Sequence, residues 1–327
     1  MPEKLDISAP ELRRLRSRLL RWYAENHRDL PWRRTQVPYR IWVSEIMLQQ
    51  TRVNAVLEHY ALFLSAFPTV QALAKADLSS VLAVWSGLGY YRRARAMHEC
   101  AKVLVQDFCG ELPRTPEELA KLPGIGKYTS AAIASIAFEH DSAVVDGNVE
   151  RVLTRMFALQ TPSAGMFAEL AQSLLHARHA GNWNQAMMEL GATVCTPAQP
   201  HCQACPLRAW CKLPGGVPAR PQPARQRKQV AYGLARKADR VYLVRRSESS
   251  GLMPGMWELP AIVRRNGERV LAKHKHSITN TDYEVTVVEL PRAQGTGKWI
   301  RAERLLQLPL TGLTRKVLRK AGVILQQ

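Results

Sequence analysis

The segment "LPGIGKYTSAAI", residues 122–133, places two glycines in a tight turn and continues into a helix. A Gly-x-Gly turn that opens a helix points backbone N–H groups outward at the positive end of the helix dipole, where anions bind. A dinucleotide-binding motif is excluded because no strand precedes the turn and its third glycine is missing. The segment therefore predicts one of two structures. Gly124, Gly126 and Lys127 either hold a phosphate, or belong to a helix connection that needs glycine only for left-handed φ.

The charge of the whole chain favours the phosphate. Its 327 residues include 46 Lys and Arg against 27 Asp and Glu, a net charge of +19. Such an excess predicts an anionic partner, usually nucleic acid. The basic residues are scattered through segments that look folded, which disfavours a polybasic membrane binder. We therefore expect a helix-hairpin-helix that holds one DNA strand by its backbone and reads no sequence.

Membrane and secretory signals are missing from the printed sequence. No stretch approaches 18 uninterrupted apolar residues, and the opening "MPEKLDISAPEL" has no apolar core. We expect a cytoplasmic protein that contacts no membrane and, if bacterial, associates with the nucleoid through DNA.

Four of the six cysteines lie close together, with the spacing C-x6-C-x2-C-x5-C. Clustering of this kind without a secretory signal indicates a metal centre in place of a disulfide framework. Four thiolates suit either a [4Fe–4S] cluster or zinc. The single C-x2-C pair favours iron–sulfur and leaves zinc open. The four are Cys195, Cys202, Cys205 and Cys211.

The composition and periodicity of the sequence change near residue 212. Residues 11–194 show helical spacing of apolar residues, whereas 212–229 are rich in Pro, Gly and Arg. Beyond them "VAYGLA", "RVYLVRR" and "YEVTVVEL" are typical of strands, and 301–320 of closing helical turns. We predict a mainly α domain over 1–212, a linker over 213–229 and a small α+β domain over 230–327.

Glu45 lies in the apolar helix "YRIWVSEIMLQQTRV", residues 39–53. Glutamate is seldom buried without a reason, and desolvation raises its pKa, so a protonated Glu45 could act as a general acid. A salt-bridged or partly exposed glutamate is the alternative.

Asp146, in "AVVDGNVERVL" (143–153), has the position of a helix N-cap. Capping does not exclude chemistry. A protonated Glu45 and an ionised Asp146 would form a pair with opposed roles.

Together these segments resemble the endonuclease III superfamily of helix-hairpin-helix DNA glycosylases, and within it the adenine DNA glycosylase (MutY) family. The resemblance covers nearly the whole chain. Its carriers are "LPWR" (30–33), "PYRIWVSEIMLQQTRV" (38–53), "GLGYYRRAR" (87–95), "LPGIGKYTSAAI", "VVDGNVERVL", "NQAMMELGATVCTP" (184–197) and the four cysteines.

The resemblance implies a base-excision repair hydrolase that flips adenine out of duplex DNA where it is mispaired with 8-oxoguanine or guanine. Glu45 would protonate adenine N7, Asp146 would stabilise the oxocarbenium-like sugar and Asn148 would orient both. By the same transfer Arg28, Trp32 and Glu189 line the adenine side. Gln50, Thr51, Leu88 and Tyr90 meet the opposite base. A [4Fe–4S] cluster with a structural role and a monomeric state are implied too.

Tyr128 separates two activities within the superfamily. Relatives that also cut the strand carry a lysine at this position, which forms a Schiff base with the sugar. A phenol cannot do this, so the resemblance implies a monofunctional enzyme without strong lyase activity.

The C-terminal segment resembles a shortened Nudix-like domain that inspects 8-oxoguanine. Where relatives read "FSH" this chain has Ile278, Thr279 and Asn280, so the preference for 8-oxoguanine is open. No Nudix metal box is present, which disfavours pyrophosphate hydrolysis.

Two alternatives compete with this function. The first is a bifunctional glycosylase and lyase, which Tyr128 disfavours. The second is a non-catalytic iron–sulfur DNA-binding protein, which the joint presence of Glu45 and Asp146 disfavours.

Overall fold

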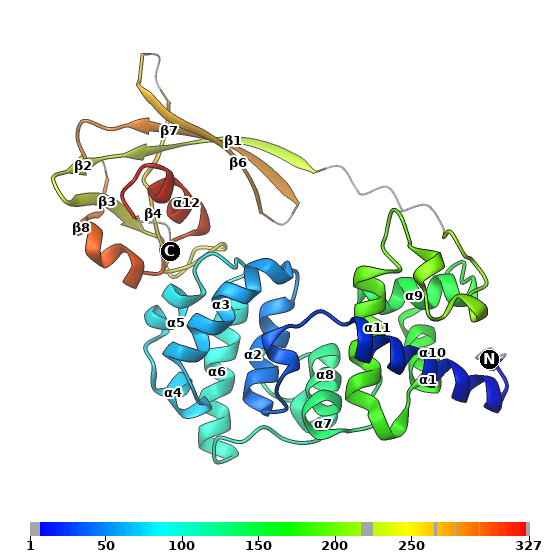
Figure 1. The fold of residues 1–327 in the computed structure, drawn as a ribbon. Helices are drawn as coiled ribbons and strands as arrows, with labels where there is room; N and C mark the ends of the chain where they lie inside the picture. The colour runs from blue at the N-terminus through cyan, green and yellow to red at the C-terminus, as the bar shows by residue number, and fades with distance from the viewer. Residues whose placement is uncertain (1–6, 217–224, 265–266, 279, 294, 325–327) are drawn as a thin grey trace. The chain divides into compact units, whose positions relative to one another are not determined.

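The chain forms two compact units in a computed structural model that describes residues 7–216, 225–264, 267–278, 280–293 and 295–324. One unit is Met1–Val53 with Val103–Pro221, and the other is Asn54–Lys102 with Gln222–Gln327. Helices occupy the first part of the chain and the sheets lie in the last (Figure 1). No helix in the described ranges has the length and apolar character needed to cross a membrane.

Residues 11–194 are mainly helical, as predicted; they belong to the first unit and, for residues 54–102, to the second. Polar caps start several of these helices: Ser8 forms a capping box with Glu11, and Thr115 and Ser163 accept from backbone N–H groups in the first turns of their helices. The helices are α1 (Ala9–Asn26), η1 (Pro31–Arg33), α2 (Pro38–Leu48), α3 (Val53–Ala66), α4 (Val70–Lys75), α5 (Leu78–Trp85), α6 (Arg92–Asp107), α7 (Pro116–Leu119), α8 (Lys127–Phe138), α9 (Gly147–Phe157), α10 (Ala164–Leu174), η2 (Ala177–His179), α11 (Ala180–Thr193), η3 (Cys202–Ala204) and η4 (Arg208–Trp210).

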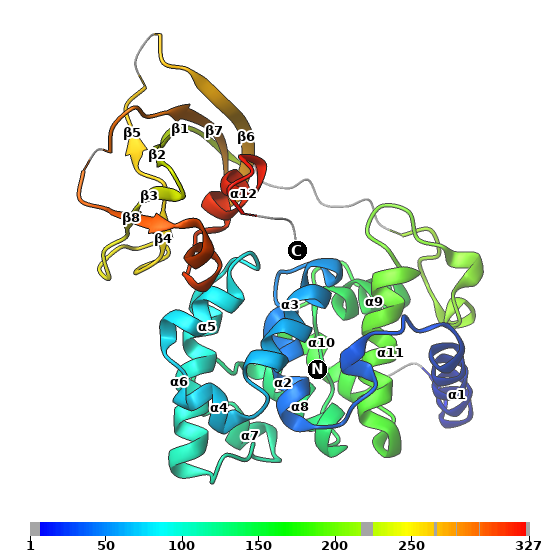
Figure 2. The same cartoon turned by 60° about the vertical axis from the view of Figure 1, so that its left-hand side comes forward.

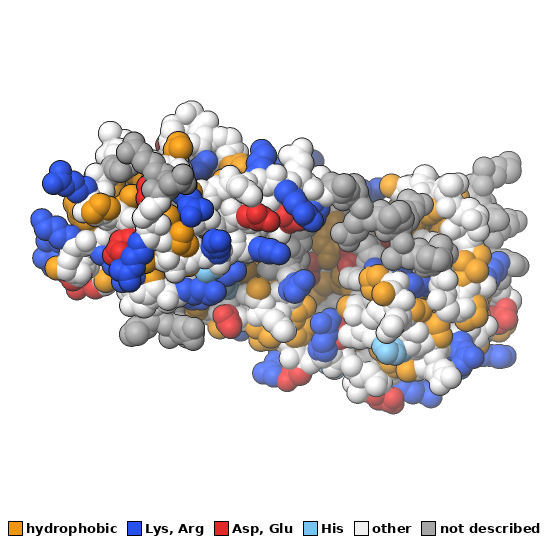
Figure 3. All heavy atoms as spheres, turned by 90° about the horizontal axis from the view of Figure 1, so that it is seen from above, with side chains coloured by type: hydrophobic (Ala, Val, Ile, Leu, Met, Phe, Trp, Pro, Cys, Tyr) orange, Lys and Arg blue, Asp and Glu red, His pale blue; other side chains and the backbone are white. Residues whose placement is uncertain are grey.

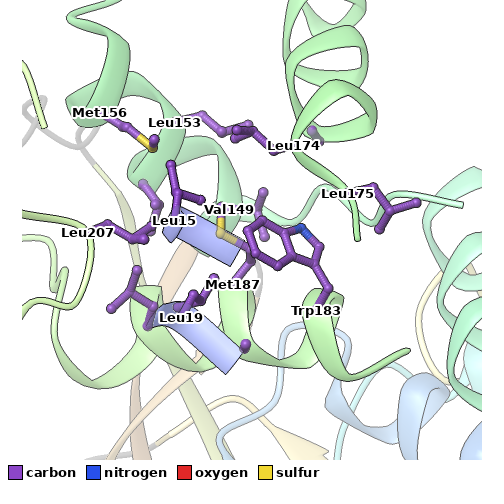
Figure 4. Close-up of a cluster of buried hydrophobic side chains, with 14 of the residues drawn as sticks. Leu15, Leu19, Val149, Leu153, Met156, Leu174, Leu175, Trp183, Met187 and Leu207 are labelled. Carbon is purple, nitrogen blue, oxygen red and sulfur yellow. The ribbon is translucent and has the colours of Figure 1, made fainter. Parts of the chain in front are cut away.

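A buried apolar cluster holds α1, α9, α10 and α11 together. Leu15 and Leu19 of α1 meet Leu153 of α9 and Trp183 of α11, all 1% exposed or less (Figure 4). Leu207, from the segment that follows α11, packs into the same cluster. The core thus fixes α9 against α11 and anchors the segment that carries the four cysteines.

The C-terminal part is the predicted α+β region. One sheet has the order β5-β1-β7-β6, with β1 parallel to β7; in the second, β2 and β4 pair with β3, and so does β8 (Figure 2). An apolar cluster that includes Leu243, Val287 and Leu318 joins the sheets to α12. The elements are β1 (Gln226–Leu234), β2 (Arg236–Lys237), β3 (Arg240–Arg245), β4 (Trp257–Glu258), β5 (Ala261–Ile262), β6 (Val270–Ile278), β7 (Thr281–Glu289), β8 (Lys298–Arg301), η5 (Ala302–Gln307) and α12 (Gly312–Lys320).

The expected linker, 213–229, is structured at both of its ends. Strand β1 begins at Gln226, because residues 226–234 pair in register with β7. At the other end Leu213 donates its N–H to Arg155 O over 3.0 Å. Residues 217–224, like Thr279, lie outside the described residues.

Within the second unit, helices and C-terminal elements touch directly. Buried Ser86, after α5, donates its hydroxyl to Leu310 O over 2.6 Å. This contact explains why residues 54–102 group with the C-terminal sheets.

Candidate active site

The Gly-x-Gly hairpin leaves its backbone open to solvent. Gly124 has φ +75°, which requires glycine, whereas Gly126 has an ordinary φ of −91° and caps α8. A Cβ at Gly126 would meet nothing within 4 Å. Lys127 is exposed beside it. Neither backbone strain nor a protein neighbour therefore requires glycine at 126, and the space beside its Cα is open.

Glu45 is buried in α2 with 5% of its surface exposed. Its Oε2 accepts a hydrogen bond from the Tyr128 hydroxyl at 3.0 Å. Burial raises the pKa of Glu45 to about 7, with the charge of Asp146 adding to the rise and Tyr128 and Arg33 opposing it. Glu45 is therefore buried and hydrogen-bonded to a neutral phenol, and its role as an acid stays a prediction.

Tyr128 stands in the first turn of α8, where the sequence placed it. Its hydroxyl also lies 3.4 Å from Met188 Sδ of α11. Burial and then the negative charges of Glu45 and Asp146 raise the pKa of Tyr128 well above its ordinary value. Tyr128 is therefore a neutral donor, and it joins α8 to the acid on α2.

Asp146 is the predicted N-cap, at the start of α9. Its Oδ1 accepts from the N–H groups of Asn148 and Val149 at 2.9 and 2.8 Å, and its Oδ2 from Asn148 Nδ2 at 2.8 Å. Because Asp146 shifts the pKa of both Glu45 and Tyr128, the structure brings these three side chains into one site. Asn148 orients Asp146 directly.

Arg151 is a residue that the sequence reasoning missed. Its Nη2 donates to Asn148 Oδ1 at 2.7 Å and to Gly191 O at 2.6 Å, and its Nε donates to Cys195 O at 2.7 Å. Asn148 is thus fixed between Asp146 and a guanidinium. The available signal was one helical turn of spacing from Asn148 to Arg151.

Gly191 permits the close contact between α9 and α11. A Cβ at Gly191 would lie 2.6 Å from Asn148 Cβ and 2.8 Å from Asn148 O. Any other residue would displace the side chain that holds Asp146.

Glu189 of α11 is completely buried and is held by two arginines. Arg28 Nε donates to Oε1 at 2.8 Å, while Arg28 Nη2 and Arg33 Nη2 each donate to Oε2 at 2.7 Å. Burial alone would raise the pKa of Glu189, but these hydrogen bonds outweigh it and lower the pKa to about 2. Trp32 lies in η1, between Arg28 and Arg33 in the sequence, and is 6% exposed. Arg33 was not among the predicted site residues, although it ends the motif "LPWR".

The residues expected to meet the opposite base come from both units. Exposed Gln50 follows α2 with φ +55°, and Thr51 Oγ1 donates to Gln49 O at 3.3 Å. In the second unit Leu88 is buried, and Tyr90, with φ +47°, is 37% exposed. The guanidinium of Arg93 lies 5.2 Å from the Tyr90 ring centroid. Asn280, just before β7, is exposed.

The four clustered cysteines line one hollow together with Arg155, Arg208 and Pro214. All four are free thiols in the structure. Among the described residues no group of three or more His, Cys, Asp or Glu is placed to hold a single metal ion. Four thiols around one hollow are nevertheless a donor set that suits either a [4Fe–4S] cluster or zinc.

Known proteins match this chain in sequence and in fold. The profile of the HhH-GPD superfamily base excision DNA repair proteins matches residues 43–177. Adenine DNA glycosylase of Rattus norvegicus is 44% identical over 64% of this chain and 44% of its own length. That of Schizosaccharomyces pombe is 32% identical over 77% of this chain and 70% of its own length. The chain thus spans less than half of the rat protein.

Among solved structures, a thermostable thymine-DNA glycosylase has a TM-score of 0.58. It is 30% identical, and the match covers 62% of this chain and 95% of that one.

Proposed function

The chain belongs to the adenine DNA glycosylases of the HhH-GPD superfamily, and from this premise we propose that it hydrolyses the N-glycosidic bond of adenine mispaired with 8-oxoguanine or guanine in duplex DNA. One observation carries the proposal. A buried carboxyl, Glu45, has a pKa of about 7 beside the carboxylate of Asp146. Two carboxyl groups with opposed protonation states are what glycoside hydrolysis requires.

Glu45 acts as the general acid. In its protonated form it donates to N7 of the flipped adenine, and the base leaves with the electron pair of the bond to the sugar. The Tyr128 hydroxyl, 3.0 Å from Oε2, keeps the Glu45 side chain in place.

Asp146 stabilises the positive charge that develops on the sugar. Asn148 and the N–H groups of the first turn of α9 hold its two oxygens. Water then adds to the sugar carbon and passes a proton to Asp146, which leaves an abasic site with an intact strand.

The remaining predicted residues bind the substrate. The open N-terminus of α8 with Gly124, Gly126 and Lys127 receives a backbone phosphate. Trp32 and the Arg28–Glu189 pair recognise adenine. The opposite base meets Gln50, Thr51, Leu88 and Tyr90, and Asn280 with Thr279 inspects 8-oxoguanine in the Nudix-like domain. Lys and Arg side chains are exposed in Figure 3, and the net charge of +19 suits an anionic partner.

The four cysteines hold a [4Fe–4S] cluster. Their number, their C-x6-C-x2-C-x5-C spacing and the shared hollow support this cofactor. When bound, the cluster supplies a rigid cross-link between α11 and the segment up to Cys211. No catalytic step passes through it.

The protein acts as a monomer on DNA in the cytoplasm, at the nucleoid if it is bacterial. Sedimentation of the free protein tests the monomer.

A single-turnover assay tests the function on duplexes carrying 8-oxoguanine:A, G:A or T:A, with the products run directly and after hot alkali. We expect breaks only after alkali, fastest for 8-oxoguanine:A. Breaks without alkali would favour the bifunctional glycosylase and lyase. No cleavage in either lane would favour the iron–sulfur DNA-binding protein.

A further inference from the structure

Arg155 of α9 is a buried arginine aimed at the cysteine segment, with 5% of its surface exposed. Its Nη1 donates to Thr196 O at 2.7 Å and lies 3.3 Å from Cys195 Sγ. Its Nη2 donates to Pro197 O at 2.9 Å. One guanidinium therefore contacts a cysteine sulfur and the two carbonyls that follow it.

The segment 213–216 packs against Arg155 and one of the cysteines. Leu213 donates its N–H to Arg155 O, and Gly215 donates its N–H to Cys202 Sγ at 3.2 Å. Gly216 has φ +84°, and a Cβ there would lie 2.6 Å from Arg155 Nε. Glycine at 216 therefore allows the backbone to lie directly on the guanidinium.

The negative charge of the proposed cofactor explains why a buried arginine and N–H donors would lie beside these sulfurs. A [4Fe–4S] core with two positive charges and four thiolates carries two negative charges in all. Burying that charge is costly unless cations and hydrogen-bond donors face it. Among the arginines that line the hollow, Arg155 is buried, whereas Arg208 is exposed.

We propose that Arg155 and the segment 213–216 form a lid over the cluster, in which Arg155 is the counter-cation and donates to Cys195 Sγ, and the Gly215 N–H donates to Cys202 Sγ. The lid slows loss of the cluster. It also moves the midpoint of the couple in which the cluster takes up one electron, from the 3+ to the 2+ core, to more positive potential. Donors to sulfur favour the more negative, reduced form. This inference rests on the iron–sulfur part of the proposed function.

Arg155→Met tests the lid, with Arg208→Met as its matched control in the same hollow. The readouts are iron and sulfide per chain, the rate at which cluster absorbance decays under a chelator in air, and the midpoint potential of the DNA-free protein. We expect Arg155→Met to lose its cluster about ten-fold faster and to have a more negative midpoint, while Arg208→Met matches wild type.

Two further variants keep the test decisive if Arg155→Met does not fold. Arg155→Lys keeps the positive charge but cannot donate to Cys195 Sγ, Thr196 O and Pro197 O together. Its midpoint potential should therefore stay close to that of wild type, while its cluster is lost faster. Gly216→Ala should push Arg155 away and speed the loss. Gly165→Ala is its control, because a Cβ there meets nothing nearer than 3.7 Å.

The outcomes separate this inference from the function. Wild-type protein without iron overturns the cofactor and the lid together. Wild-type protein that holds iron, with Arg155 and Gly216 variants indistinguishable from their controls in decay and midpoint, overturns the lid and leaves the glycosylase untouched.

Discussion

Two buried glutamates of the first unit, Glu45 and Glu189, have opposite electrostatic surroundings. Glu45 is 5% exposed and accepts a hydrogen bond from the neutral phenol of Tyr128, and burial raises its pKa to about 7. Glu189 is fully buried as well, but two arginines donate to its oxygens and lower its pKa to about 2.

The difference shows that partners decide the charge of a buried carboxyl, since burial is common to both. Desolvation favours the neutral acid, and a guanidinium at hydrogen-bond distance reverses that preference. The same unit thus holds a proton donor on α2 and a permanent anion on α11.

Glu45→Gln has the largest expected effect. The amide keeps the size of the side chain and can still accept from Tyr128, but it cannot donate an acidic proton. We expect the single-turnover rate on an 8-oxoguanine:A duplex to fall about 1,000-fold. Circular dichroism should show an unchanged fold, and a rate like that of wild type would remove Glu45 from its role as acid.

Glu189→Gln should lower the free energy of unfolding. It leaves Arg28 and Arg33 without their carboxylate, and breaking a buried pair costs about 3 kcal/mol or more. The denaturation midpoint should fall accordingly. Glu150→Gln, at an exposed position on α9, is the control, and equal midpoints for the two variants would contradict the pairing.

Stability should depend on pH with opposite signs at the two glutamates. Between about pH 4.5 and 7 the folded state holds a proton on Glu45 that the unfolded chain has lost, so Glu45 destabilises the fold as pH rises through this window. The stability that Glu189 contributes is lost as pH falls from about 4.5 to about 2.

The free energy of unfolding of wild type and of Glu45→Gln, measured at pH 5 and pH 8, tests whether Glu45 destabilises the fold as pH rises. Relative to the variant, wild type should lose about 2.5 kcal/mol between the two values. A difference that does not change with pH would mean that Glu45 is charged throughout.

Tyr128→Phe has the smallest expected effect. Removing the donor costs about 1 kcal/mol of stability. Because the hydrogen bond lowers the pKa of Glu45, its loss should move the decline of the single-turnover rate to higher pH. Met188→Leu, which changes the other neighbour of the hydroxyl, should leave that decline where it is in wild type.

The sequence by itself determined the features that depend on neighbouring residues. Asp146 before an apolar-periodic helix is an N-cap, the 122–133 turn needs glycine at 124, and helical periodicity ends where the cysteines begin. Capping, left-handed φ and periodicity are short-range effects, so they can be recognised from a few consecutive residues.

Only the tertiary structure decided the charges and contacts of these groups. Tyr128 is 83 residues from Glu45, and Arg28 is 161 from Glu189. Arg151 links Asn148 to the carbonyl of Cys195, and glycines of the expected linker lie on Arg155 and Cys202. A pKa depends on how much water is excluded and which charges lie within a few ångströms, and the fold sets both by bringing distant segments together.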